Sequence, residues 1–390
     1  MNKIKAEQFA TVRKASEDLK KENFGGIYFT DKGEKAHLNV LTSKADAFAR
    51  FVSEDVILHP VKYSWGQLNE AQDAATSLFG KKGIHCSDVS LQGNHAVIGV
   101  MDDSEDALAE IRAEMSKLGF AEDMYVIEKA DPIRFMNMPE SEVSEAEMAT
   151  PLQTRDSSIT TIMPGGLLTY KTSNGTYKLM ASLTFGFNYN GHPFFVGAAH
   201  ALSSTDFNNG VQVYYTPYAG NGYPVSTNNI TAAYNSAERV LLGTAMLRKL
   251  TGNYDFTSVQ CTQSGLNFSH TAYNGCEISS IGGSLAVGDT LRLCGVTTRY
   301  DADYEIGTCT STQTSASVSG ITVSNMIKID LVGNTGTSGG PIMVYEPNTN
   351  TYRLIGMCSA QGANCVYGAN INYVMNGYNL TILPEGNITI

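Results

Sequence analysis

Towards the C-terminus the chain reads Gly336-Thr337-Ser338-Gly339-Gly340-Pro341, a glycine-rich turn that contains one serine. The small neighbours leave the serine hydroxyl open to a substrate, and they let the backbone N–H groups of Gly336 and Ser338 point into one space, where they can stabilise an oxyanion. Well upstream, the apolar run before Val196-Gly197-Ala198-Ala199-His200 predicts a buried strand with a histidine at its end. Serine is a poor nucleophile until a base takes its proton. We therefore interpret Ser338 as a nucleophile and His200 as its base.

A site of this kind needs a third residue, an acid that is buried and holds the imidazole in one tautomer. Asp255 is followed by Phe-Thr-Ser-Val at a loop-to-strand junction, where an acid can be buried. Asp330 is the alternative, because it shares a strand with Ile327 and Ile329 on the opposite face. Of the three histidines after residue 150, only His200 lies in a small-residue turn after an apolar strand. We predict a site made of His200, Asp255 and Ser338.

These motifs resemble the streptogrisin and alpha-lytic group of bacterial chymotrypsin-like serine proteases. The resemblance extends to Ser182–Asn190 before the histidine and to Thr251–Val259 around the aspartate. Residues 24–130, less specifically, resemble the pro-domain that such proteases have in front of the enzyme. The resemblance implies a zymogen: an N-terminal α+β pro-domain followed by an all-β, double six-stranded barrel of the chymotrypsin-like type.

The resemblance also assigns roles. It implies a serine endopeptidase with His200, Asp255 and Ser338 as the catalytic triad, and with the N–H groups of Gly336 and Ser338 as the oxyanion hole. Ser359 lies on the strand that pairs with the substrate backbone and hydrogen-bonds the aspartate in this family, and Gln361 falls at the specificity pocket. The implied partners are a polypeptide substrate and the chain's own pro-domain, which assists folding and occupies the active site until it is cleaved.

Two positions depart from the family pattern. Thr337 stands where an aspartate usually braces the oxyanion loop, and Ala201 stands where a cysteine usually follows the histidine. Two alternatives therefore stay open. One is an HtrA-like or glutamyl-type serine protease, since a non-acidic residue before the nucleophile occurs there. The other is a catalytically inactive binding protein of the protease fold, in which Thr337 leaves the oxyanion loop collapsed.

Charge and composition divide the chain near residue 150. Residues 1–150 hold 17 Lys and Arg against 26 Asp and Glu, whereas residues 151–390 hold 10 against 12. The second part is rich in Gly, Ser, Thr, Asn and Tyr, which is typical of short strands joined by turns. No basic patch is available to neutralise phosphates, so the composition argues against a nucleic-acid partner.

Cysteine usage follows the same division, with Cys86 alone in the first part. Cys294 and Cys309 resemble the family's internal disulfide. Six cysteines allow 15 pairings, and the sequential one closes loops of 15, 15 and 7 residues. We expect that pairing: Cys261–Cys276, Cys294–Cys309 and Cys358–Cys365. The sequence contains no Cys-x-x-Cys pair, which argues against a zinc site. We expect neither a metal nor a cofactor.

Disulfides imply an oxidising compartment, so the sequence predicts a secreted protein. No stretch approaches the length of a membrane span, and the N-terminus lacks the apolar core of a signal peptide. Three explanations stay open: a signal has been removed, export uses another route, or the disulfide interpretation is wrong.

We predict three regions. Residues 1–135 form the pro-domain, residues 136–158 a linker with low hydrophobicity and acidic charge, and residues 159–390 the protease domain. The linker is expected to be cut between Ala149 and Thr161. The expected pro-domain elements are helices at 5–21, 65–80 and 104–118, hairpins at 26–41 and 87–101, and strands at 56–63 and 123–129. Ala233–Leu247 is the one helical pattern in the second part.

Overall fold

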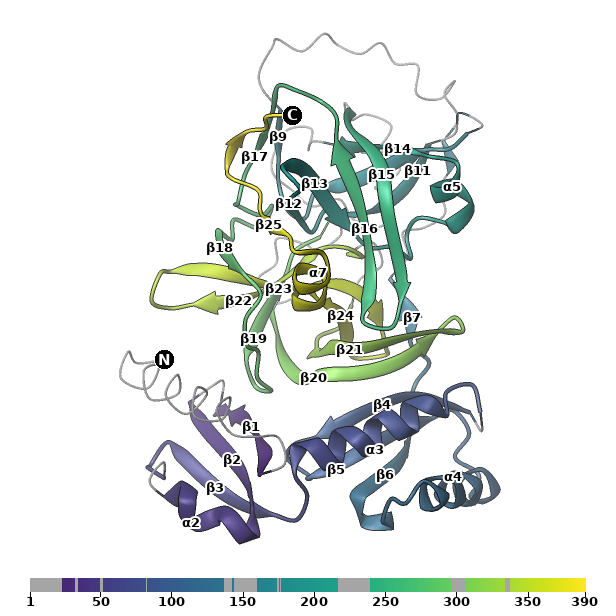
Figure 1. Cartoon of the computed structure of the whole chain (residues 1–390), viewed down its shortest axis with the longest axis vertical. Coiled ribbons are helices and arrows are strands. Elements are labelled where there is room, and N and C mark those ends of the chain that lie inside the picture. Colours follow the sequence, from purple (N-terminus) through teal and green to yellow (C-terminus); the bar gives the residue numbers. More distant parts are fainter. Residues whose placement is uncertain are drawn as a thin grey trace. The chain divides into compact units, whose positions relative to one another are not determined.

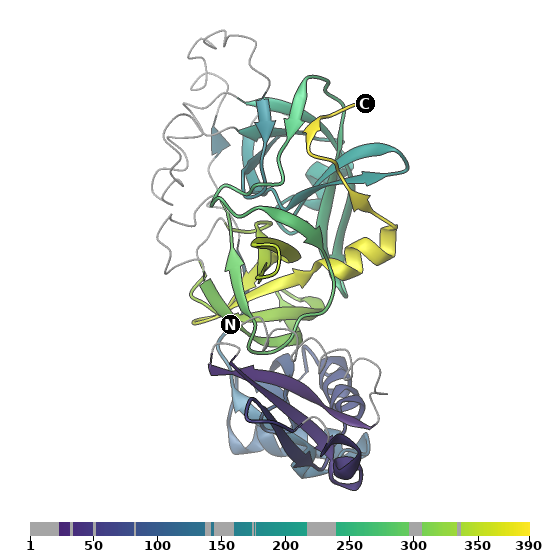
Figure 2. The ribbon, with the colours of Figure 1, turned by 90° about the vertical axis from the view of Figure 1, so that its left-hand side faces the viewer.

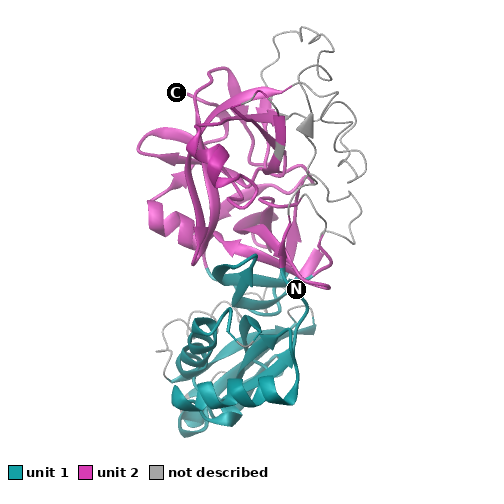
Figure 3. Ribbon diagram, turned by 90° about the vertical axis from the view of Figure 1, so that its right-hand side faces the viewer, with its two compact units in different colours: residues 1–133, 284–290, 308–330 teal, residues 134–283, 291–307, 331–390 magenta. Residues whose placement is uncertain are grey.

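The structure is a computed structural model of the chain. It describes residues 23–31, 34–49, 52–81, 83–136, 142–143, 160–173, 175, 177–216, 239–295, 306–333 and 337–390. The chain divides into two compact units, coloured separately in Figure 3. Unit 1 comprises Met1–Ile133, Ser284–Thr290 and Thr308–Asp330, and unit 2 comprises Arg134–Gly283, Leu291–Gly307 and Leu331–Ile390. The helix expected at 5–21 and most of the expected linker lie outside the described residues.

Unit 1 combines helices and strands (Figure 1). Its first elements are β1 (Phe24–Thr30), β2 (Lys35–Leu41), the 3-10 helix η2 (Thr42–Lys44), α2 (Ala45–Phe48) and β3 (Val56–Val61). They are followed by α3 (Trp65–Ser77), β4 (Ile84–Ser90), β5 (His95–Val100), α4 (Glu105–Lys117), the 3-10 helix η4 (Glu122–Met124) and β6 (Tyr125–Lys129). β1, β2 and β3 form one sheet in that order. The predicted hairpins and the two predicted helices at 65–80 and 104–118 are confirmed, with ends that differ by a few residues.

Local chemistry explains where α3 and α4 begin. The Ser64 side chain accepts the backbone N–H of Gln67, and the Gln67 side chain accepts the backbone N–H of Ser64, which is a capping box. Ser104 occupies the N-cap of α4 as predicted, although its side chain makes no capping bond. The buried faces of both helices meet the β4–β5 sheet in one core, which includes Ala71, Ala75, Ile84, Ile98, Val100, Ile111 and Met115.

A hairpin from far along the chain completes the second sheet of unit 1. It consists of β20 (Ile306–Val318), which belongs to this unit from Thr308 onward, and β21 (Ile321–Asp330). Within unit 1 the strand order is β21-β20-β4-β5-β6. Ser87 lies opposite Ser315, and the Gln72 side chain donates to the Gln313 carbonyl oxygen at 2.6 Å. Unit 1 thus contains two segments that lie within the sequence range predicted for the second domain.

Unit 2 is built mainly of strands. Those before residue 270 are β7 (Arg134–Phe135), β8 (Glu142–Val143), β9 (Thr160–Ile162), β10 (Leu167–Lys171), β11 (Tyr177–Ser182), β12 (Phe185–Tyr189), β13 (His192–Gly197), β14 (Gln212–Thr216), β15 (Val240–Thr251), β16 (Tyr254–Cys261) and β17 (Leu266–Phe268). The later strands are β18 (Ile278–Ile281), β19 (Thr290–Leu293), β22 (Pro341–Glu346), β23 (Thr351–Gln361), β24 (Val366–Asn370), β25 (Thr381–Ile382) and β26 (Gly386–Asn387). The helices described in it are α5 (Ser204–Asn208) and α7 (Ile371–Tyr378), which is yellow in Figure 2.

Among the described residues of unit 2, the strands pair in three groups. The longest sheet has the order β25-β12-β13-β16-β15-β14-β10-β11-β8, and a small one has the order β26-β17-β9. A third group has the order β19-β22-β23-β24, with β18 and β7 also paired to β23. One core joins these groups through fully buried aromatic rings, among them Phe185, Phe187, Phe195, Phe256 and Phe268. No helix in the described part of the chain is long and apolar enough to span a membrane.

The helix predicted at Ala233–Leu247 is wrong for its described part. Residues 240–247 belong to β15, a strand of the central sheet that pairs with β14 and β16. Leucine, alanine and methionine favour a helix in isolation, but pairing on both sides satisfies the backbone in the strand. Tertiary context here overrides local propensity.

The predicted disulfides are not present in the structure, which shows no disulfide among the described cysteines. Cys358 lies opposite Gly368 in the β23–β24 ladder, whereas Cys365 pairs with Gly362 at the turn. At a strand rise of about 3.3 Å per residue, Cys358 and Cys365 are roughly 13 Å apart along the ladder, beyond the ~7 Å between Cα atoms that a disulfide allows. Two other thiols contact a nearby carbonyl oxygen: Cys261 that of Gln263 at 3.6 Å, and Cys309 that of Ser311 at 3.4 Å.

Candidate active site

Two neighbouring strands bring His200 and Asp255 together. β13 ends at Gly197, shortly before His200, and β16 begins at Tyr254, immediately before Asp255. The two strands are antiparallel, and Gly197 lies opposite Thr257. The end of β13 therefore lies beside the start of β16, which places a histidine and an acid from distant parts of the sequence at one point.

Ser338 completes a hydrogen-bonded line of three side chains. His200 Nδ1 lies 2.6 Å from Asp255 Oδ2, and His200 Nε2 lies 2.6 Å from Ser338 Oγ. The backbone N–H of His200 donates to the other carboxylate oxygen, Asp255 Oδ1, at 3.0 Å. A neutral imidazole with its proton on Nδ1 presents a lone pair on Nε2 to the serine hydroxyl. This is the geometry in which a histidine can take the proton of Ser338.

Asp255 is held as a carboxylate by its partners. It is fully buried, and burial alone would raise the pKa of Asp255. The neighbouring His200 and the hydrogen bonds from His200 and Ser359 outweigh burial, so the pKa of Asp255 lies below its usual value. The buried negative charge can in turn stabilise an imidazolium at His200.

Two further side chains support this pair. Ser359 Oγ on β23 donates to Asp255 Oδ2. Arg248 on β15 donates from its Nε to the carbonyl oxygens of Ala199 at 3.1 Å and Leu202 at 2.6 Å. These two carbonyls flank His200, so Arg248 fixes the turn that carries the histidine. Arg248 was not among the predicted site residues, because an arginine in an alternating strand has no distinctive local pattern.

The turn that carries Ser338 is fixed by backbone contacts. Ser182 N–H donates to the Ser338 carbonyl oxygen at 2.6 Å, and Gly339 N–H donates to the Cys358 carbonyl oxygen at 2.8 Å. Gly339 has φ +78°, and a Cβ atom there would lie 2.4 Å from the Ser182 carbonyl oxygen. Only glycine fits this position. Gly336, predicted for the oxyanion hole, lies outside the described residues.

A short strand runs directly across the site. β7 pairs antiparallel with the end of β23, with Phe135 opposite Ala360 and Arg134 opposite Gln361. The next residue, Met136, donates its N–H to the Ser359 carbonyl oxygen at 3.0 Å. The Phe135 ring stacks on the His200 imidazole, with centroids 4.5 Å apart. With this strand in place the His200 side chain is 1 % exposed and Ser338 is 0 % exposed.

Gln361, predicted for the specificity pocket, contacts this strand and also the segment before the Ser338 turn. In the amide orientation that satisfies its neighbours, Gln361 donates to the Gly333 carbonyl oxygen at 3.0 Å and accepts from Arg134 Nε at 3.2 Å. Gln361 is buried. It therefore links the strand that covers the site to the segment that leads into the Ser338 turn.

The remaining candidates lie elsewhere. His192 is exposed, and His270 Nε2 lies 2.8 Å from the Leu383 carbonyl oxygen. Asp330, the alternative acid, is exposed at the end of β21 in unit 1. The structure thus joins His200 to Asp255 and Ser338, and not to Asp330.

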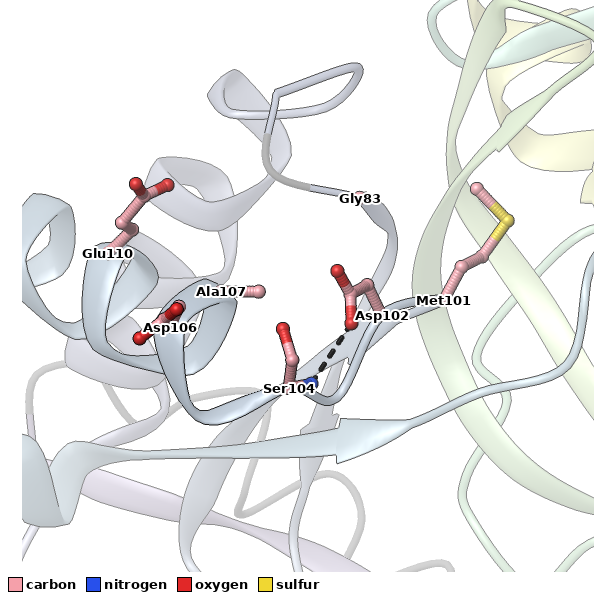
Figure 4. Close-up of a pocket in the computed structure, with 7 residues that line it drawn as sticks. All are labelled: Gly83, Met101, Asp102, Ser104, Asp106, Ala107 and Glu110. Carbon is pink, nitrogen blue, oxygen red and sulfur yellow. Dashed lines mark hydrogen bonds between the residues drawn. The ribbon is translucent and has the colours of Figure 1, made fainter.

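A separate hollow lies in unit 1 beside the start of α4 (Figure 4). It is lined by Gly83, Met101, Asp102, Ser104, Asp106, Ala107 and Glu110. Asp102 accepts the backbone N–H of Ser104 at 3.0 Å, the dashed line in Figure 4. None of the predicted catalytic residues lines this hollow. Within the described ranges, no group of three or more His, Cys, Asp or Glu could hold a metal ion.

Neither a protein-family model nor a curated protein matches the sequence. Among solved structures, the alpha-lytic protease homolog N4 is similar at a TM-score of 0.40 and 14% identity, over 57% of this chain and 99% of that one. The chymotrypsin of Cellulomonas bogoriensis has a TM-score of 0.40 and 18% identity, over 57% and 98%. The Nocardiopsis protease has a TM-score of 0.40 and 19% identity, over 58% and 100%. We therefore infer function from the geometry of the site.

Proposed function

We propose that this chain is the precursor of a serine endopeptidase. The observation that carries the proposal is the line from Ser338 through His200 to Asp255, with contacts of 2.6 Å on both sides of the imidazole. The substrate class follows from the neighbouring edge of β23. That edge holds an extended peptide segment, Arg134–Phe135, by backbone pairing, and backbone pairing recognises any polypeptide in an extended conformation.

The proposed reaction has two halves. Ser338 Oγ attacks the peptide carbonyl carbon while His200 Nε2 takes its proton, and His200 then gives that proton to the leaving amine. In the second half, water attacks the acyl carbon while His200 Nε2 takes its proton. His200 then gives that proton to Ser338 Oγ, which restores the Ser338 hydroxyl and releases the acid. Asp255 holds the imidazole in the required tautomer and stabilises the imidazolium.

The oxyanion hole is the part of the proposal that rests on sequence. The backbone N–H groups of Gly336 and Ser338 would donate to the tetrahedral oxyanion, because a glycine-rich turn lets both point to the same side. Removing a single donor of this kind typically lowers kcat by about 10²–10³-fold.

We further propose that residues 1–135 act as a pro-domain that keeps the enzyme inactive and assists its folding. Support for the inhibitory role comes from β7, which follows unit 1 directly in the sequence and buries Ser338 and His200. Thr337 cannot form the ion pair that an aspartate before the nucleophile would make. Activation is therefore expected to come from release of the covering strand, and not from a new terminus inserted beside Ser338.

The proposal is tested by hydrolysis of a denatured protein substrate by the full-length chain. Ser338→Ala and His200→Ala are each expected to lower kcat by about 10⁶-fold, because the nucleophile and its base act as a unit. Asp255→Asn should lower it by about 10⁴-fold. Ser204→Ala, at an exposed serine in α5, is the matched control and should leave activity unchanged.

Two results would contradict the proposal. Activity that survives Ser338→Ala would place the chemistry elsewhere. A wild-type chain that binds peptides but cleaves none, even after limited proteolysis of residues 137–159, would favour the inactive binding protein.

A further inference from the structure

The segment that covers the site has the direction and register of a bound substrate. Arg134, Phe135 and Met136 run antiparallel to the end of β23, and successive backbone contacts reach Gln361, Ala360 and Ser359. The chain therefore runs towards Ser338, with Phe135 over His200. Met136 is the last residue of this run and the one that contacts the residue preceding the nucleophile.

The side chain of Met136 fills a space of its own. Met136 is 0 % exposed, and its Sδ lies 3.7 Å from Thr337 Oγ1. Its Cε lies beside Gly333, where a Cβ atom would be 3.1 Å from Met136 Cε and 3.0 Å from a methyl group of Val366. These three neighbours of the Met136 side chain are uncharged. The space exists because residue 333 has no side chain, and it accepts a long apolar group.

The two residues before Met136 are held less tightly. Phe135 is half-buried and Arg134 is exposed, although Arg134 Nε donates to the Gln361 side chain. Burial thus increases along the segment towards Ser338. Selection by side chain is expected to be strongest at the position that Met136 occupies, since that is the fully desolvated one.

We propose that the bond between Met136 and Asn137 is cut by Ser338 of this protein, and that its specificity pocket selects methionine or leucine on the acyl side of the cleaved bond. This inference rests on the proposed function. The Met136 carbonyl carbon forms an ester with Ser338 Oγ, and the proton of Ser338 passes through His200 to the amine of Asn137 as the C–N bond breaks. Water then releases the Met136 carboxylate and restores Ser338. The cut lies upstream of the Ala149–Thr161 segment expected from the linker composition.

The first test follows the purified full-length chain by intact mass and N-terminal sequencing. A new N-terminus at Asn137 is expected. Met136→Asp should slow its appearance by about 100-fold or more, because an unpaired carboxylate would be buried among uncharged groups. Met138→Asp is the matched control and should be cut like the wild type, and Met136→Leu should still be cut.

The second test changes the specificity pocket and leaves the covering segment unchanged. Gly333→Ala places a methyl group beside Met136 Cε. The chain is first incubated so that the covering segment is released, and it is then assayed on fluorogenic peptides Arg-Phe-X that differ only at X. The variant should shift its preference at X from methionine towards alanine. The wild type should prefer methionine and leucine to alanine, glutamate and lysine by at least about 10-fold. Thermal unfolding of each variant establishes that it is folded.

The outcomes separate this inference from the proposed function. If a fluorophosphonate labels Ser338 and peptides are hydrolysed, but the chain is cut elsewhere or prefers glutamate, the enzyme assignment holds and the inference is wrong. If Ser338 is neither labelled nor able to hydrolyse any peptide, the proposed function itself fails. A cut at Met136–Asn137 that persists in Ser338→Ala would also overturn the inference, since another protease would be responsible.

Discussion

Phe135 lies flat on the imidazole of His200, with ring centroids 4.5 Å apart and ring planes 10° apart. A ring in this position prevents a substrate from approaching the histidine from that side. Phe135 is held there by the pairing of β7 with β23, which Met136 extends through its bond to Ser359. The strand thus fits the site as a peptide and blocks it at the same time.

Replacing Phe135 should weaken this block. Aromatic pairs contribute about 0.5–1.5 kcal/mol beyond the area that they bury, so Phe135→Ala should speed fluorophosphonate labelling of the intact chain by up to about 10-fold. Phe135→Tyr, which keeps the ring, is the control and should label at the wild-type rate. Labelling of Phe135→Ala that is no faster than wild type would mean that the stack does not restrain the strand.

The lowered pKa of Asp255 predicts a loss of stability in acid. In the unfolded chain an aspartate titrates near pH ~3.9. Because the folded pKa is lower, the ionised Asp255 stabilises the fold above that pH, and this contribution is lost as pH falls through the folded pKa. Thermal midpoints measured by circular dichroism in a Ser338→Ala background should fall less steeply below pH ~4 in Asp255→Asn than in its parent. Asp330→Asn, at an exposed acid, should follow the parent curve, and identical slopes in all three would contradict the account of Asp255.

Arg248 is expected to act on catalysis through the position of His200. Arg248→Ala removes both bonds to the His200 turn and should lower kcat by about 10–100-fold, the cost of a small misplacement of a catalytic group. KM should change little, because the hydrogen bonds that the structure describes for Arg248 go to the His200 turn and not to the covering strand. Lys249→Ala changes an exposed neighbour and should have no effect. A raised KM with an unchanged kcat in Arg248→Ala would show that Arg248 does not position the histidine.

The state of the cysteines distinguishes the structure, which has no disulfide, from the disulfides expected from the sequence. Alkylation under denaturing, non-reducing conditions should modify all seven cysteines, since the structure shows no disulfide among them. In the folded chain Cys86 and Cys365 should react first, because the other five are buried; burial also raises the pKa of Cys358. Peptides linked as Cys261–Cys276 or Cys294–Cys309 would contradict this and would restore the ground on which the sequence predicts secretion.

His200, Asp255 and Ser338, which the structure brings together, each carry a local mark in the sequence. Ser338 lies in a glycine-rich turn and His200 follows a buried strand. Asp255 is favoured over Asp330 because an acid at a loop-to-strand junction before an apolar run can be buried, and Asp330 stays the alternative until the structure places it, exposed, at the end of β21. The left-handed backbone of Gly339, which only glycine adopts without strain, is a finding of the structure.

The parts that the sequence did not reveal depend on contacts between distant segments. Nothing near Arg248 indicates that its guanidinium reaches the carbonyls beside His200. The pairing of Ser87 with Ser315, like that of Phe135 with Ala360, joins segments separated by more than half the chain. The expected disulfides are absent from the structure. For Cys358 and Cys365 the reason is strand register, about which sequence spacing says nothing.

The central claim is that His200 activates Ser338 as a nucleophile. The most direct measurement is the intact mass of the chain after treatment with a fluorophosphonate, followed by peptide mapping, on full-length protein whose covering segment has been released by incubation or by limited proteolysis. The account predicts one adduct per chain, located on Ser338, that is absent in Ser338→Ala and strongly slowed in His200→Ala. A chain that stays unlabelled, or an adduct on another serine that His200→Ala does not affect, would contradict it.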